Sequence, residues 1–201
     1  MTLMKTLIAS AAFAALAAPA MAKTPTGSAA PNFTVKDTAG VTHSLSDFRG
    51  KNVVLEWTNH QCPYVVKHYS SDNMQGTQKA LAGNDTVWLS VISSAPGKQG
   101  HVSSSEADAL TASRGAAPTA VLMDPSGTMG RAYDAKTTPH MYIIDPSGTL
   151  VYQGAMDSNR SSNPATIPDA TNYVKAAMAD LAAGNPVAQN DTQPYGCTIK
   201  Y

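Results

Sequence analysis

The stretch VVLEWTNHQCPYVVKHY, residues 53–69, joins an apolar run directly to a cysteine and a proline. Residues 53–57 suit a strand that is buried on both faces. Pro63 opens a helix, because the first helical position needs no backbone N–H and favours the fixed φ of proline. Cys62 is therefore expected between a buried strand and the N-terminus of a helix.

A thiol in that place has two interpretations. The unpaired N–H groups and the positive dipole end of a helix favour a thiolate. We therefore expect the pKa of Cys62 to lie below the value of about 8.5 of a free cysteine, which makes it a nucleophile. The alternative is a small hydrophobic side chain packed in the core. The direct succession of strand, cysteine, proline and helix favours the nucleophile.

The other elements follow from apolar periodicity and turn residues. Strands are predicted at residues 33–35, 41–45, 53–57, 86–92, 119–123, 140–144 and 149–153, and helical segments at 46–50, 63–83, 106–114, 127–133 and 169–183. Strands that alternate with helices and end in a hairpin and a last helix predict an α/β fold. We expect a mixed central sheet with helices on both faces and an N-terminal hairpin.

The first 22 residues have the pattern of a secretory signal peptide. Residues 1–5 carry one positive charge, residues 6–18 are small and apolar, and residues 19–22 end in an A-x-A site. The apolar core is shorter than the roughly 20 residues of a spanning helix. The sequence predicts a periplasmic or otherwise exported protein, soluble after cleavage, whose thiols lie where disulfides persist.

Composition excludes some classes of partner. The chain has 14 Lys+Arg and 14 Asp+Glu and no basic run. A net charge near zero argues against nucleic acid or a membrane surface as the main partner.

The chain divides into four parts. Residues 1–22 are the signal peptide, residues 23–30 a flexible lead-in, residues 31–184 one domain, and residues 185–201 a tail. The tail carries Cys197, the only other cysteine, and its Pro, Gly and polar residues predict a mobile arm.

A second motif, KTTPHMYIID at residues 136–145, places a proline directly before a strand, where a cis peptide bond has a structural use. This motif and the strand-then-cysteine stretch together resemble the thioredoxin fold. Residues 30–51 resemble the opening of extracytoplasmic redoxins and peroxiredoxins of the alkyl hydroperoxide reductase/thiol-specific antioxidant group. The resemblance covers residues 30–183. It implies that the loop at Thr138 and Pro139 lies against Cys62 and offers backbone groups to a substrate.

The sequence also departs from those families. Thioredoxins carry C-x-x-C, whereas Val65 stands here at the position of the second cysteine. The motif therefore resembles the CPYC of glutaredoxin with its last cysteine lost. Peroxiredoxins carry P-x-x-x-[ST]-x-x-C. In this sequence, Leu55 stands at the proline position and Asn59 at the Ser/Thr position. The Cys62–Pro63 pair is shared with peroxiredoxins. Asn59 remains a candidate donor of a hydrogen bond to the substrate.

Histidines near Cys62 raise the question of a metal. His60 and His68 flank the cysteine, but no second cysteine lies at metal-ligand spacing. His68 is about 240° around the helix from Cys62. We interpret both as packing or solvent-facing histidines, with no metal site and no cofactor. His140 is expected near the site, where it tunes polarity.

These features predict a thiol-dependent oxidoreductase. Cys62 attacks a peroxide oxygen or the sulfur of a protein or small-molecule disulfide, and Cys197, from the same or a second chain, resolves the product. The residues expected to position the substrate are Asn59, Pro63, Thr138 and Pro139. An external thiol is the expected reductant. The alternative is a non-catalytic thioredoxin-fold binding or metal-handling module with a structural Cys62–Cys197 disulfide.

Overall fold

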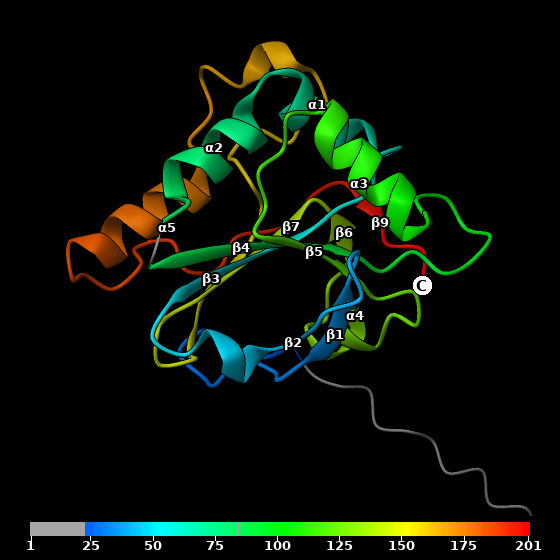
Figure 1. Cartoon of the computed structure of the whole chain (residues 1–201). Coiled ribbons are helices and arrows are strands. Elements are labelled where there is room, and N and C mark those ends of the chain that lie inside the picture. Colours follow the sequence, from blue (N-terminus) through cyan, green and yellow to red (C-terminus); the bar gives the residue numbers. More distant parts are fainter. Residues whose placement is uncertain (1–22, 84) are drawn as a thin grey trace, which may run out of the picture.

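The computed structural model of the protein describes residues 23–83 and 85–201 (Figure 1). The predicted signal peptide lies outside the described residues. The strands are β1 (Thr34–Asp37), β2 (Thr42–Ser44), β3 (Asn52–Trp57), β4 (Thr86–Ile92), β5 (Ala120–Met123), β6 (Thr137–Thr138), β7 (His140–Ile144), β8 (Leu150–Gly154) and β9 (Cys197–Thr198). The helices are α1 (Pro63–Ser70), α2 (Asn73–Leu81), α3 (Ser104–Ser113), α4 (Thr128–Ala132) and α5 (Tyr173–Ala182), with the 3-10 turns η1 (Leu45–Phe48) and η2 (Pro164–Thr166).

Seven strands form one mixed sheet in the order β2-β1-β5-β4-β3-β7-β8. The three inner strands β3, β4 and β5 run parallel, whereas β1 and β7 pair antiparallel with their neighbours. The β1–β2 hairpin and the β7–β8 hairpin form the two edges. The predicted mixed sheet and N-terminal hairpin are confirmed.

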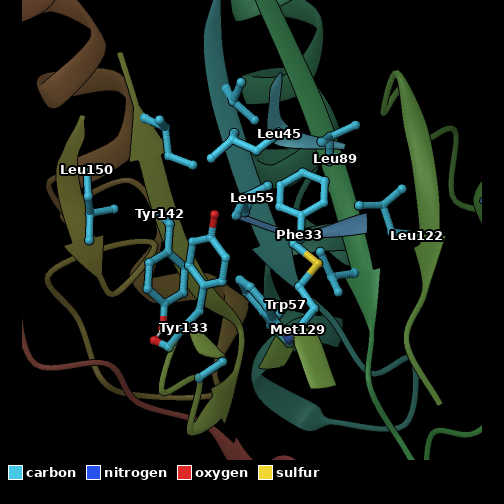
Figure 2. Packing of buried hydrophobic residues seen from close by; sticks show 14 of the residues in the cluster. Phe33, Leu45, Leu55, Trp57, Leu89, Leu122, Met129, Tyr133, Tyr142 and Leu150 are labelled. Carbon is cyan, nitrogen blue, oxygen red and sulfur yellow. Dashed lines mark hydrogen bonds between the residues drawn. The ribbon is translucent and has the colours of Figure 1, made fainter. Parts of the chain in front are cut away.

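Helices cover both faces of this sheet, as predicted. In Figure 1, α1, α2, α3 and α5 lie on one face, and η1 and α4 lie on the other. Strand β3 is buried on both faces because its apolar residues alternate between them. Leu55 and Trp57 belong to the core under η1 and α4 (Figure 2). Val54 packs with Cys62 in the core under the larger group of helices.

The single helix predicted at residues 63–83 is wrong, because the structure has α1 and α2 with a break between them. Asp72 takes a left-handed backbone conformation with φ of 59°. Ser71 turns its hydroxyl back to the carbonyl of Lys67 at 2.8 Å. Short polar side chains compete for backbone groups in this way, and the run SSDN at residues 70–73 ends the helix.

Two helices begin at other residues than predicted, and side-chain caps explain both. Helix α3 starts at Ser104 because Ser103 and Glu106 form a capping box. Helix α5 starts at Tyr173 because the Asn172 side chain accepts a hydrogen bond from the N–H of Lys175 at 2.9 Å.

The lead-in at residues 23–30 and the C-terminal tail are packed against the domain, which differs from the flexible lead-in and mobile arm that we predicted. The N–H of Gly27 donates to the carbonyl of Leu150 at 2.8 Å. The tail forms β9, which pairs antiparallel with β6.

Within residues 23–83 and 85–201, no helix is both long and apolar enough to cross a bilayer.

Candidate active site

The junction of β3 and α1 sets the position of Cys62. The cysteine is the N-cap residue of α1, and Pro63 is the first residue of that helix, as predicted. The N–H of Cys62 donates to the carbonyl of Asn59 at 3.0 Å, which closes the turn between strand and helix. Cys62 is fully buried, so its thiol lies under other parts of the chain rather than in solvent.

The loop before β7 contacts the Cys62 thiol. The Thr138–Pro139 peptide bond is cis, as predicted. The Cys62 thiol donates a hydrogen bond to the carbonyl oxygen of Thr138, with the sulfur 3.0 Å from that oxygen. Distant parts of the chain thus bring the predicted cysteine and the predicted loop into contact.

The tail adds the second thiol to this place (Figure 1, β9 in red beside β6). Cys197 pairs with Thr138 and Thr198 with Thr137 in the antiparallel register of β9 and β6. The N–H of Cys197 donates to Cys62 Sγ at 3.4 Å. The structure therefore places both cysteines side by side in one chain as free thiols.

The two thiols differ in their electrostatic surroundings. Burial raises the pKa of Cys62, but hydrogen bonds outweigh it and the pKa lies below its ordinary value. These bonds come from the Cys197 thiol, the side chain of Thr138 and the backbone N–H groups of Val65 and Cys197. Burial and the neighbouring Cys62 raise the pKa of Cys197 to about 12. Of the two, Cys62 is the thiol that ionises first.

Asn59 lies near Cys62 in the chain but is turned elsewhere. Its carboxamide oxygen accepts from the N–H of Gln61 at 2.9 Å. The residue lines a cavity of about 20 Å³ together with residues of α3 and β4. Its carboxamide oxygen therefore helps to close the turn before Cys62, and the expected hydrogen bond from Asn59 to a substrate stays a prediction.

The histidines differ from one another in surroundings. His68 and His140 are buried, and burial lowers the pKa of His68 to about 4 and that of His140 to about 3. His140 Nδ1 accepts from the N–H of Lys136 at 3.2 Å, so it supports the loop before β7. Among the described residues, no group of three His, Cys, Asp or Glu side chains is placed to hold a metal ion.

Glu56 was not singled out in the sequence, although it interrupts the apolar run of β3. Its carboxylate is fully buried, and burial raises its pKa. It accepts four hydrogen bonds, from Tyr69 Oη at 2.8 Å, Trp88 Nε1 at 2.9 Å, and Gln78 Nε2 and Ser90 Oγ at 3.1 Å each. This carboxylate ties α1 and α2 to the sheet.

The tail contains a signal that the sequence analysis missed. Tyr195, Cys197, Ile199 and Tyr201 alternate with polar or small residues, which is the period of a strand. Tyr195 and Ile199 are buried, and Tyr201 Oη donates to the carbonyl of Ala135 at 2.7 Å. Apolar alternation around the second cysteine therefore indicates a docked strand rather than an arm.

Comparison with known proteins agrees with this geometry. The model of the AhpC/TSA family matches residues 26–153. None of the curated proteins matches the chain.

Solved structures share its fold. A hypothetical protein from Sinorhizobium meliloti is 22% identical with a TM-score of 0.75, over 90% of this chain and 96% of that one. An uncharacterised conserved protein from Geobacillus kaustophilus is 25% identical with a TM-score of 0.74, over 88% and 92%. The thioredoxin domain of a thiol-disulfide oxidoreductase from Bacteroides vulgatus is 20% identical with a TM-score of 0.52, over 73% and 98%. The predicted thioredoxin-like fold is confirmed.

Proposed function

The chain belongs to the AhpC/TSA family, and on that premise we propose that it is an exported thiol–disulfide oxidoreductase that uses Cys62 as nucleophile and Cys197 as resolving thiol. One observation carries the proposal. The β6–β9 pairing holds the N–H of Cys197 3.4 Å from Cys62 Sγ, in a fold where residue 65 is valine. The tail thus supplies the second thiol that the helix lacks.

The reaction follows from the two pKa values. The Cys62 thiolate attacks one sulfur of a substrate disulfide, forms a mixed disulfide and releases the other sulfur as a thiolate. Cys197 then loses its proton to that thiolate and attacks Cys62 Sγ. The second substrate sulfur leaves, the substrate is reduced to two thiols, and the enzyme holds a Cys62–Cys197 disulfide.

The exposure of the two sulfurs decides which of them an external thiol attacks when the enzyme is reduced again. Cys197 is half-buried whereas Cys62 is fully buried. An external thiol therefore attacks Cys197 Sγ and expels Cys62, whose lowered pKa makes it the better leaving group. A second molecule of the thiol then attacks the sulfur of the first molecule in that mixed disulfide, so the two molecules leave as a disulfide and Cys197 is released as a thiolate.

Reduction of peroxide is the second candidate, favoured by the match to the AhpC/TSA family. The Cys62 thiolate attacks a peroxide oxygen, and the sulfenic acid condenses with Cys197 to the same disulfide with loss of water. Disulfide exchange has the better support, because Asn59 stands at the position where peroxiredoxins carry a Ser or Thr hydroxyl. Cys62 is also covered by an extended peptide segment, the form that a polypeptide substrate takes.

The test compares the wild type with Cys62→Ser and Cys197→Ser. Each reduced protein is mixed with oxidised glutathione, and in parallel with hydrogen peroxide, and the products are mapped by mass spectrometry. The wild type should form the Cys62–Cys197 disulfide within one chain, Cys197→Ser should stop at a glutathione adduct on Cys62, and Cys62→Ser should not react. A native Cys62 that reacts with neither oxidant leaves the non-catalytic binding module as the better description.

Export belongs to the same proposal and rests on residues 1–22. Intact mass of the protein from its exporting host should show Lys23 as the first residue. Retention of residues 1–22 would contradict export.

A further inference from the structure

A buried cluster of polar side chains lies beside the site and takes no part in the proposed exchange. Lys67 of α1, Asp157 after β8 and Tyr195 of the tail are exposed by only 1%, 2% and 5%. Lys67 Nζ lies 2.9 Å from Asp157 Oδ2 and donates to the carbonyl of Asn159 at 2.7 Å. Tyr195 Oη donates to Asp157 Oδ1 and lies 3.3 Å from Lys67 Nζ. Three separate segments therefore meet at one ion pair.

A second layer of contacts fixes the Tyr195 side chain. Asn73 Nδ2 lies 2.8 Å from His68 Nδ1, and His68 Nε2 lies 3.4 Å from Tyr195 Oη. A neutral His68 that accepts at Nδ1 donates from Nε2, so the hydrogen bonds run from Asn73 through His68 and Tyr195 to Asp157. The Tyr195 ring also packs edge-on against Tyr64 at a centroid distance of 5.7 Å.

The cluster spans the two halves of the proposed site. Lys67 lies on α1, the helix that begins directly after Cys62 in the sequence, and Tyr195 precedes Cys197 by two residues. We propose that Lys67, Asp157 and Tyr195 form a latch that fastens the tail to α1 and so positions Cys197 against Cys62. The inference rests on the proposed function. These three are positioning residues, since the hydrogen bonds to Cys62 Sγ among the described residues involve Thr138 and Cys197 and none of the three.

The latch has two opposite effects on the chemistry. While it is closed, the tail shields Cys62 from large reagents and keeps Cys197 at a high effective concentration. When it opens, a substrate reaches Cys62 but the internal disulfide forms more slowly. Loss of one buried hydrogen bond changes such an equilibrium by about tenfold.

The test uses Tyr195→Phe, which removes the hydroxyl and keeps the ring. Tyr133→Phe is the matched control, because Tyr133 Oη also donates one hydrogen bond, to the carbonyl of Pro31 at 2.6 Å, in the core on the other face. The first readout is the equilibrium of the Cys62–Cys197 disulfide with glutathione. The second is the rate at which a maleimide reagent alkylates Cys62 in a Cys197→Ser background.

Tyr195→Phe should lower the effective concentration of Cys197 about tenfold and raise alkylation of Cys62 by a similar factor. Asp157→Asn should shift both in the same directions. If neither quantity moves, or if Tyr133→Phe moves them equally, the latch is overturned and the cluster only stabilises the fold.

Hydrogen exchange separates this inference from the proposed function. The N–H of Ile199 donates to the carbonyl of Lys136 at 3.0 Å, so its exchange reports opening of the tail. Exchange about tenfold faster in Tyr195→Phe, with unchanged global unfolding, supports the latch even where glutathione gives no disulfide in the wild type. In that case the proposed function fails while the latch stands. Unchanged exchange of Ile199 overturns the latch whatever the thiols do.

Discussion

Gly196 offers the sharpest single perturbation of the proposed site. Its φ is 140°, and a Cβ built there would meet the carbonyl oxygen of Thr138 and lie 2.7 Å from its carbonyl carbon. A methyl group needs about 3.5 Å from a neighbouring heavy atom, so in Gly196→Ala the tail must withdraw from β6 by about 1 Å. A misplacement of about that size costs up to roughly 100-fold in an oriented reaction. We expect disulfide closure between Cys62 and Cys197 to slow by about 10- to 100-fold.

The assay is a rapid-quench time course of the reduced protein with oxidised glutathione. It resolves the mixed disulfide on Cys62 from the closed Cys62–Cys197 product by mass spectrometry. Gly184→Ala is the control, because Gly184 has φ of 74° and no atom within 4 Å of a built Cβ. Gly184→Ala carries backbone strain of about 1 kcal/mol with no clash, whereas Gly196→Ala adds a less favourable φ of 140° to the clash with Thr138, so only Gly196→Ala should accumulate the mixed disulfide. Closure at the wild-type rate in Gly196→Ala would refute the docked-tail mechanism.

Three further predictions concern ionisation and burial. In the wild type, the rate at which iodoacetamide alkylates Cys62, followed by peptide mass spectrometry, should rise with pH around a midpoint below about pH 8.5, since hydrogen bonds that include one from the Cys197 thiol lower its pKa, and a midpoint at or above that value would contradict the nucleophile. Glu56→Ala should cost about 3 kcal/mol or more in urea unfolding, because four buried donors lose their acceptor, and Glu56→Gln should cost less. The folded pKa values of His68 and His140, about 4 and about 3, lie below 6.5, so the unfolded chain binds more protons and stability is lost as the pH falls from 6.5. Each should cost about 2 kcal/mol by pH 5, and His140→Gln should remove its share of that slope in urea titrations at pH 7 and pH 5.

The sequence predicted the parts of this molecule that local chemistry dictates. The apolar run predicted strand β3, and Pro63 predicted the start of the helix directly after Cys62. The resemblance to the thioredoxin fold placed Thr138 against Cys62. The sheet followed from alternation of strands and helices. These features depend on residues adjacent in the chain or on a fold with recognisable motifs.

Contacts between distant polar residues were beyond that reasoning. Nothing local to Lys67 distinguishes it from a solvated lysine on a helix, and only the folded chain brings Asp157 and Tyr195 to it. Composition also misled the prediction for the tail, where Pro, Gly and Asn suggested mobility. The alternation from Tyr195 to Tyr201 carried the opposite information.

The packed lead-in at residues 23–30 and the packed tail have a consequence for solubility. Strand β8 is an outer strand of the large sheet, and such a strand offers unpaired backbone groups to other molecules. The lead-in pairs with the start of this strand, where Gly27 N–H donates to the carbonyl of Leu150, and the tail bridges to it at Gln153 and Asp191. Each end thus caps part of this outer strand. Proteolytic trimming of either end would open a template for edge-to-edge self-association, and we expect trimmed protein to aggregate at concentrations where the intact chain stays dispersed.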